Sequence, residues 1–220
     1  MTYTGATISN FLLNATAGIL IVAMTLVQVG GGMSAQEAGF LTIGYAVAIV
    51  AFIRVGEKLL QRFGPRRPMI WGSIIVGAAI LCLMPTNLLI ETYTILAVVG
   101  FTLFGLGLAF YATPSTDAAL SALPDDQAGT GAGIYKMASS LGASFGVAIS
   151  ATIFTVLSKT EDPVQWIDGV ITYLGRQDNV AVREAALVAL AVNLLMVIAA
   201  IISIMITIPK ETPAANTTDH

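Results

Sequence analysis

The feature that most constrains this sequence is the placement of its charges, which gather in short blocks separated by stretches of nearly uncharged residues. Each stretch holds about twenty residues, the length that a helix needs to cross roughly 30 Å of hydrocarbon. Only 10% of the 220 residues are charged, whereas a water-soluble domain carries roughly 25%. The sequence therefore predicts an all-α membrane protein built as a six-transmembrane-helix bundle.

Turn residues and charges divide the chain into six predicted spans, one longer connection and a tail. The spans occupy about residues 7–29, 38–58, 69–86, 92–113, 130–157 and 185–208. One six-helix domain thus covers 1–208, with an outer loop at 158–184 and a polar tail at 209–220. A short amphipathic helix is predicted within the outer loop, because apolar residues follow helical spacing at Val164, Ile167, Val170, Ile171 and Leu174.

Basic residues predict the direction of insertion, since short loops rich in Lys and Arg stay in the cytoplasm. The loop between the second and third spans holds four of them: Lys58, Arg62, Arg66 and Arg67. The turns after the first and third spans hold none. We therefore expect the 2–3 loop and both termini to be cytoplasmic, and the loop at 158–184 to lie outside.

The composition excludes most site chemistry. The single histidine is His220 in the tail and the single cysteine is Cys82 in an apolar run, so no metal site, cofactor or Cys/His pair is expected. The run Gly142-Ala-Ser144-Phe-Gly146 matches a hydrolase serine motif, but no span supplies a histidine base. A pI near 5.0 and no basic run longer than Arg66-Arg67 argue against nucleic acid as a partner. A non-enzymatic membrane protein is expected.

The first span carries a polar stripe that an apolar environment does not explain. The spacing of these polar residues along an α-helix would put them all near one face. They are Thr7, Asn10, Asn14, Thr25 and Gln28. They could form hydrogen bonds between helices, worth roughly 0.6 kcal/mol per pair, or line a substrate cavity. Ser140 of the fifth span is expected in the same cavity lining, whereas Gly142 and Gly146 have the spacing of close helix packing.

Four ionisable side chains lie at or near membrane depth: Arg54, Glu57, Asp117 and Lys136. A charge within a membrane is costly and usually functional. Arg54 and Glu57 are three residues apart, so they could simply form an ion pair that anchors the second span. The long side chain of Lys136 could instead extend to the membrane surface. The alternative is a proton-coupling and gating network made of all four.

The loop from Glu57 to Arg67 resembles the second copy of the loop motif of the major facilitator superfamily, G-x-x-x-D-R-x-G-R-R. Arg62, Gly64 and Arg66 or Arg67 match, and Gln61 stands at the acidic position. Similar features are Gly105-Leu-Gly107 in the fourth span, the glycine- and serine-rich run 133–148 and the long outer loop. Together they resemble the C-terminal half of a 14-span drug:proton antiporter, of the quaternary-ammonium and multidrug efflux type.

This resemblance implies a mechanism and a set of partners. The chain would be one half of a bacterial plasma-membrane transporter that exports lipophilic, typically cationic, drugs against protons by alternating access. Its partners would be the lipid bilayer, the drugs, protons and the missing N-terminal bundle. Spans 1, 2, 4 and 5 would face that bundle and spans 3 and 6 would face lipid, in agreement with the distribution of polar residues.

The resemblance also narrows the candidates for proton transfer. The quaternary-ammonium pumps have acidic residues where this chain has Ile49 and Ser140. Glu57 and Asp117 are then the carboxylates that remain for coupling. The alternative function is a truncated or half-size membrane protein without independent transport, acting as a scaffold or subunit.

Overall fold

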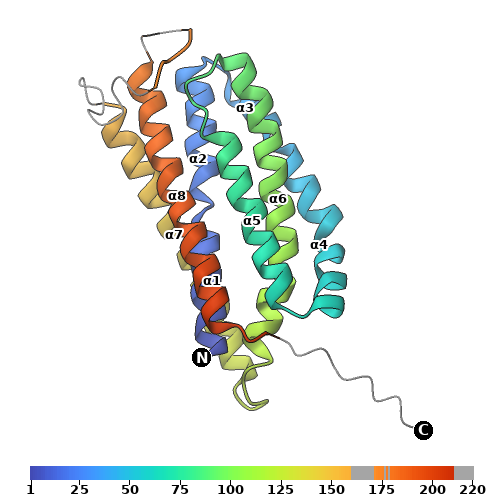
Figure 1. The fold of residues 1–220 in the computed structure, drawn as a ribbon. Coiled ribbons are helices and arrows are strands. Elements are labelled where there is room, and N and C mark those ends of the chain that lie inside the picture. Colours follow the sequence, from blue (N-terminus) through green and yellow to red (C-terminus); the bar gives the residue numbers. More distant parts are fainter. Residues whose placement is uncertain (160–170, 176, 178, 211–220) are drawn as a thin grey trace.

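A computed structural model describes residues 1–159, 171–175, 177 and 179–210. Its described part contains six helical segments that are long and apolar enough to cross a membrane, and no strand. The predicted all-α six-span bundle is therefore confirmed. The spans run roughly alongside one another and alternate in direction, so successive turns fall at opposite ends of the bundle (Figure 1).

The first span is not one uniform helix. It consists of α1 (Thr2–Ala15), α2 (Gly18–Thr25) and a wider π-helical turn, η1 (Leu26–Gly30). The break between α1 and α2 follows from Thr16, whose hydroxyl donates to the carbonyl of Leu13 at 2.6 Å. Such side-chain bonds to the backbone of the preceding turn compete with the regular helical pattern.

Six helices follow in the described part of the chain, with the same pattern of long spans and short turns. They are α3 (Ala35–Leu41) and α4 (Ile43–Phe63), which together form the second span, then α5 (Arg66–Leu83), α6 (Ile90–Leu120), α7 (Ala128–Leu157) and α8 (Val180–Thr207). Ser34 and Glu37 form a reciprocal cap at the start of α3, which satisfies backbone donors that the helix itself cannot.

Several helix ends differ from the predicted span limits. The first span begins at Thr2 rather than near 7, and α6 continues to Leu120 rather than ending near 113. The expected end lay just before Pro114, which the helix in fact contains. The last span begins at Val180 rather than near 185, because Arg183 and Glu184, assigned to the outer loop, are buried in α8.

The predicted amphipathic helix lies mostly outside the described residues, because the structure does not describe Val164, Ile167 or Val170. Ile171 and Leu174 are described and are not helical. The backbone N–H of Leu174 donates to the carbonyl of Asn87 at 2.9 Å. This short stretch therefore attaches to the turn between α5 and α6.

Glycines set the closest helix contacts. A Cβ atom at Gly142 or Gly146 would collide with the backbone of Phe11 or Ala15, so α7 packs directly on α1. A Cβ atom at Gly56 would likewise meet the carbonyl of Ala109, which brings α4 against α6. The prediction of close packing through Gly142 and Gly146 is confirmed.

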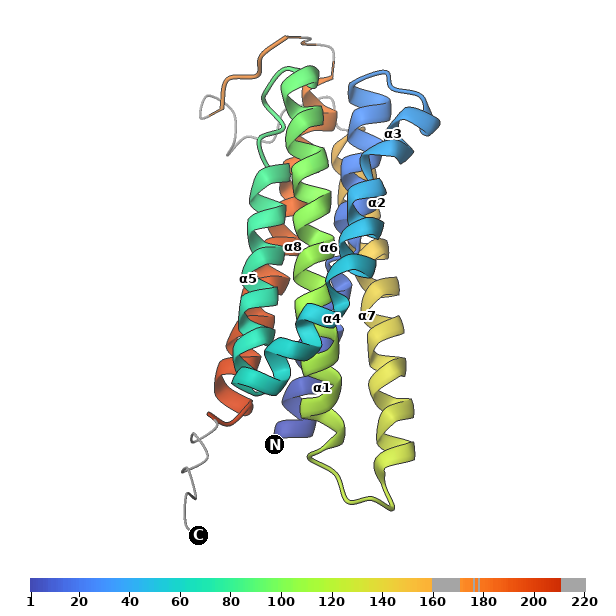
Figure 2. The ribbon, with the colours of Figure 1, turned by 90° about the vertical axis from the view of Figure 1, so that its right-hand side faces the viewer.

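The six spans are not equally covered by protein. Figure 2 shows α5 and α8 together on one side and α7 on the other, with α4 crossing diagonally between them toward the start of α5. The spans containing α4 and α7 are the least buried of the six, and those containing α1 and α6 are among the most buried. Both α5 and α8 also expose apolar side chains, such as Ile74 and Ile202. Contact of α5 and α8 with lipid stays a prediction.

Candidate functional site

A cavity of 240 Å³ lies among α1, α4, α6 and α7, the helices of the four spans expected to face a second bundle. Its wall is apolar on α4, where Ile49 and Ile53 contribute, and polar on α1 and α7. A mainly apolar pocket with a few placed polar groups is the usual form of a small-molecule site. This cavity is the candidate site for the predicted substrate.

Two asparagines of α1, Asn10 and Asn14, line the cavity. Asn10 is almost fully buried, and its amide nitrogen donates to the carbonyl of Tyr135 on α7 at 3.2 Å. The amide nitrogen of Asn14 donates to the Asn10 side-chain oxygen at 2.8 Å. Asn10 therefore links two helices and both residues reach the cavity, while their contact with a substrate stays a prediction.

The other members of the expected lining lie elsewhere. Thr25 and Gln28 are not among the cavity residues, and the Gln28 amide donates to the carbonyl of Met24 at 3.1 Å. The break at Thr16 and the π-helical turn change the register, so a face extrapolated from Asn14 to Thr25 is not continuous. Ser140 is exposed, and its neighbour Ser139 lines the cavity instead. These three assignments are corrected.

Buried tyrosines form a part of the site that the sequence analysis missed. The hydroxyl of Tyr111 on α6 shares a hydrogen bond of 2.8 Å with Ser9 on α1. The hydroxyl of Tyr135 on α7 donates to Ser115 on α6 at 2.7 Å. Both tyrosines line the cavity. A tyrosine within an apolar span needs a partner for its hydroxyl, and that requirement is the signal that could have identified them.

The four predicted charges are not brought together. Lys136 lines the cavity, whereas Arg54, Glu57 and Asp117 do not, and all four side chains are exposed. Within the described part of the chain, no ion pair joins any two of them. The ion pair, one of the two interpretations of Arg54 and Glu57, is therefore not formed among the described residues. An exposed pair gains little in free energy and loses side-chain entropy, so spacing alone does not ensure that it forms.

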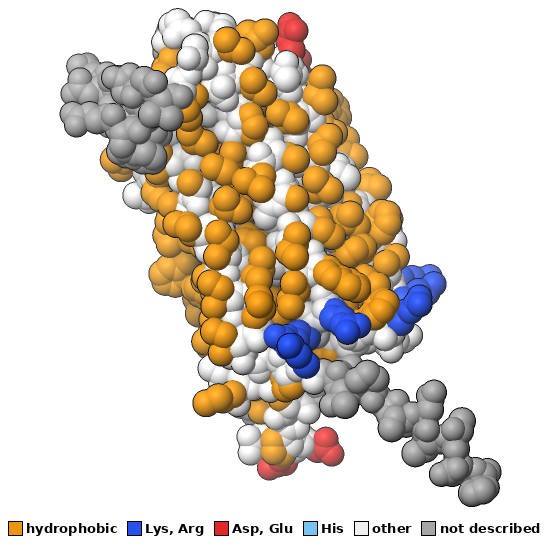
Figure 3. All heavy atoms as spheres, in the orientation of Figure 1, with side chains coloured by type: hydrophobic (Ala, Val, Ile, Leu, Met, Phe, Trp, Pro, Cys, Tyr) orange, Lys and Arg blue, Asp and Glu red, His pale blue; other side chains and the backbone are white. Residues whose placement is uncertain are grey.

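The residues of the loop motif cluster at one end of the bundle, which we call the basic end, beside the N-terminus and the start of the C-terminal tail (Figures 1 and 3). Gly64 has a φ of 68°, a left-handed value that favours glycine, and ends α4. Arg66 donates to the carbonyl of Met205 in α8 at 2.8 Å. Arg62 lies over the ring of Phe63, 5.2 Å from its centre, and Arg67 is exposed.

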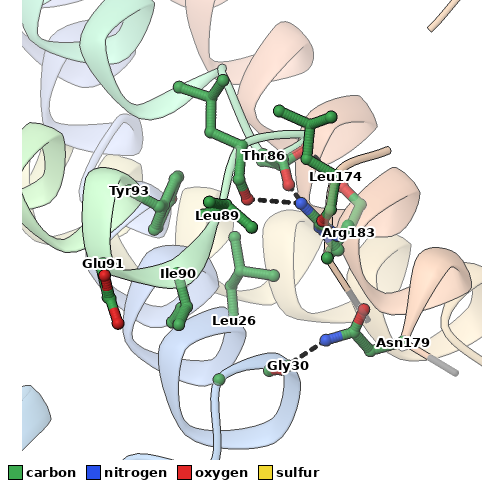
Figure 4. Close-up of a pocket in the computed structure, with 13 residues that line it drawn as sticks. Leu26, Gly30, Thr86, Leu89, Ile90, Glu91, Tyr93, Leu174, Asn179 and Arg183 are labelled. Atoms are coloured by element: carbon green, nitrogen blue, oxygen red, sulfur yellow. Dashed lines mark hydrogen bonds between the residues drawn. The ribbon is translucent and has the colours of Figure 1, made fainter. Parts of the chain in front are cut away.

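The far end of the bundle, opposite the basic end, holds a buried cation that the sequence analysis assigned to a loop. Arg183 is 5% exposed. Its guanidinium donates to three backbone carbonyls, those of Thr86, Leu88 and Leu174, while the Thr86 hydroxyl donates to the Arg183 carbonyl at 2.9 Å (Figure 4). Arg183 therefore joins α8 to the α5–α6 turn and to the segment that precedes α8.

Tyr173 covers this assembly, with the Arg183 guanidinium 5.2 Å from its ring centre. Burial, with a smaller contribution from the charge of Glu184, raises the pKa of the Tyr173 hydroxyl to about 12. The hydroxyl is therefore neutral at physiological pH, and the ring offers Arg183 a π face rather than a second ion.

Comparison with known proteins decides the family. The model of the Major Facilitator Superfamily matches residues 6–219. The chain belongs to this superfamily. The superfamily consists of membrane transporters, so the expectation of a transporter rather than an enzyme is confirmed, as is the resemblance drawn from the loop motif.

Among its relatives are the quinolone resistance proteins NorB of Staphylococcus aureus strains MRSA252 and COL. Each is 44% identical over 212 residues, which cover 95% of this chain and 41% of the relative. This superfamily member thus spans about two-fifths of the length of the curated relatives that it matches.

Proposed function

We propose that this chain forms one six-helix half of a multidrug efflux transporter of the bacterial plasma membrane, which exports lipophilic drugs in exchange for protons. The observation that carries the proposal is the cavity among α1, α4, α6 and α7, in a chain 44% identical to proteins named for quinolone resistance. The cavity offers an apolar wall for a drug ring and amides, hydroxyls and the amine of Lys136 for its polar groups.

The exposed faces of α4 and α7 support a second bundle as partner. Both helices present apolar side chains outward, including Val47, Val50, Met137 and Phe145. An N-terminal bundle packed on these helices would enclose the cavity between two halves, and rocking of the halves would open it to either side of the membrane in turn.

Four charges are assigned to coupling and gating. Asp117 near the end of α6 is the proposed proton carrier, Glu57 in the loop motif is the proposed gate, and Arg54 and Lys136 are cations that would bias the protonation of the carboxylates when the halves close. Asn10, Asn14, Tyr111 and Tyr135 are assigned to substrate contact. Proton coupling requires a carboxylate that releases its proton on one side and regains it on the other.

A chimera tests the transport proposal. The N-terminal part of NorB from S. aureus, up to the start of the matched region, is joined to this chain and expressed in a bacterium that lacks quinolone pumps. We expect inverted membrane vesicles to accumulate a fluoroquinolone when a pH gradient is imposed, and to stop when the gradient is collapsed. A chimera that inserts fully but moves neither a fluoroquinolone nor ethidium contradicts the proposal and favours the scaffold or subunit role.

Substitutions in the chimera test the residue roles. Asp117→Asn is expected to abolish gradient-driven transport without reducing insertion, because an amide cannot exchange a proton. Arg54→Ala and Lys136→Ala should impair transport less completely. Glu57→Gln is the matched control and should slow turnover while leaving coupling intact. Full transport by Asp117→Asn together with loss in Glu57→Gln would reverse the two assignments, and full transport by both would place the carrier in the N-terminal half.

Accessible cysteines test the proposed orientation, with both termini in the cytoplasm. In a Cys82→Ala background, Gln127→Cys lies in the turn before α7 and Gln36→Cys lies in α3 at the far end; both positions are exposed. An impermeant maleimide applied to intact cells should label residue 36 and not residue 127. The opposite pattern would invert the orientation.

A further inference from the structure

The cavity among α1, α4, α6 and α7 is lined by a single charged side chain within the described part of the chain. That residue is Lys136 on α7, which is exposed. Glu57 and Asp117 follow lining residues along α4 and α6 but do not themselves line the cavity. Charges interact more strongly beside apolar walls than in bulk water. The lining that this chain supplies is therefore electropositive.

The polar side chains of the lining differ in whether they already have a partner. Five of them make hydrogen bonds with protein groups: Asn10, Asn14, Tyr111, Thr116 and Tyr135. The other two, Lys136 and Ser139, make none among the described residues. An ammonium group offers three N–H donors, and a serine hydroxyl offers one O–H. Both side chains that are free to bind a ligand can therefore donate to an acceptor on it.

Lys136 and Ser139 lie close together on one helix. They are three residues apart within α7, so they occupy the same helical face, with Cβ atoms about 5–6 Å apart. A carboxylate has two oxygens and accepts several hydrogen bonds at once. One carboxylate can therefore bind the ammonium and the hydroxyl together, and its bond to the ammonium is strengthened by charge.

The apolar part of the lining suits the body of such a ligand. Ile49 and Ile53 of α4 and Leu108 of α6 supply aliphatic surface. The cavity measures 240 Å³, which exceeds the roughly 150 Å³ of an apolar cavity that binds benzene. A fused pair of aromatic rings with one acidic group can thus be accommodated.

We propose that Lys136 and Ser139 form an anion subsite, through which this cavity selects lipophilic carboxylates over lipophilic cations of the same shape. The inference rests on the proposed function, which takes this cavity as the substrate site, and it names the class of substrate. It departs from the cationic drugs that the resemblance implies, because the lining described here supplies an ammonium and no carboxylate.

The test uses the full chain in micelles of an uncharged detergent and three probes that share one ring system. They are 2-naphthoate, an anion, 2-naphthamide, which is neutral, and 2-naphthylmethylammonium, a cation. Calorimetric titration, corrected for partition into empty micelles, gives the dissociation constants. The original chain should bind 2-naphthoate most tightly. Lys136→Gln should weaken that binding about tenfold, the value of one charge-assisted hydrogen bond, and leave 2-naphthamide unchanged.

Three further variants separate charge from other effects. Lys136→Arg keeps the charge and should keep the preference for 2-naphthoate. Ser139→Ala removes a neutral donor and should weaken 2-naphthoate binding about threefold. Lys58→Gln removes an exposed lysine outside the cavity, so it is the matched control and should bind all three probes as the original chain does.

Several outcomes would overturn the proposal. They are undetectable binding of 2-naphthoate by the original chain, tighter binding of the cation than of the anion, and equal affinity of the original chain and Lys136→Gln for 2-naphthoate. Equal weakening of all three probes by Lys136→Gln would also do so, because an anion subsite does not act on the neutral amide. Binding to this chain is measured without transport, so a chimera that fails to transport leaves this result standing, and the reverse also holds.

Discussion

Arg183 at the far end of the bundle contrasts with three charged residues toward the basic end. At the far end, Arg183 is buried and its guanidinium is held by three backbone carbonyls. Toward the basic end, Arg54, Glu57 and Asp117 are exposed and form no ion pair within the described residues. A cation that donates to three main-chain carbonyls fixes loops in place. Charges without such partners remain available to pair with groups of another bundle, as a gate requires. We infer that the far end of the bundle is rigid, whereas the charged residues toward the basic end change their contacts.

The largest expected effect is the loss of Arg183. Arg183→Ala leaves three carbonyls without their donor in a buried setting, and each unpaired group costs about 1–3 kcal/mol. We expect a loss of about 3 kcal/mol or more in the free energy of unfolding, measured as the midpoint of denaturation by sodium dodecyl sulfate. Arg67→Ala, at an exposed position of the basic end, is the matched control and should change it by less than about 0.5 kcal/mol. Equal effects would remove the contrast between the ends.

A smaller effect is expected from Thr86→Val. The change keeps the shape of the side chain and removes the hydroxyl that donates to the Arg183 carbonyl, so it should cost about 1 kcal/mol. Thr94→Val is the control, because the Thr94 hydroxyl donates only to Ile90 within its own helix. The same denaturation assay should separate the two variants. A stable Thr86→Val protein would indicate that Arg183 alone fixes the far end.

The smallest effect is expected where the charges are exposed. Arg54→Ala and Glu57→Gln should each change the free energy of unfolding by less than about 0.5 kcal/mol, and the double variant should equal their sum. A double-mutant cycle on the same chain measures the coupling. A coupling free energy near 1 kcal/mol would reveal an ion pair and would add a fixed contact to the one that Arg66 makes with Met205 at the basic end.

The sequence predicts the spans well because a membrane requires long apolar helices, which hydropathy detects. The same criterion assigns charged residues to loops even where they belong to a spanning helix. The buried face of α8 repeats at steps of three and four residues through Ala186, Leu190, Asn193 and Val197. Extended backward, the same face reaches Arg183. Two adjacent charged residues, Arg183 and Glu184, are typical of a loop, which is why the sequence analysis placed them there. The continuous helical spacing is the signal that would have placed Arg183 within α8.

The cavity lining was predicted where the helix is regular and not where it is broken. Asn10 and Asn14 lie within α1, so helical spacing places them correctly. Thr25 and Gln28 lie beyond the break at Thr16, where spacing no longer predicts the face. The choice between Ser139 and Ser140 depends on how α7 is rotated against α1, which the contact at Gly142 sets and a single sequence does not.

The π-helical turn at Leu26–Gly30 has a consequence for the length of the chain. Its wide ring, in which the N–H of Gly31 donates to the carbonyl of Leu26 at 3.2 Å, holds one residue more than the α-helical turn it replaces. Deleting a single residue from this turn could restore the α-helical pattern without moving the rest of the span. The end of the first span is therefore the place in the membrane bundle where a one-residue deletion is most easily tolerated, whereas the same deletion in α6 or α7 would rotate every side chain beyond it by about 100°.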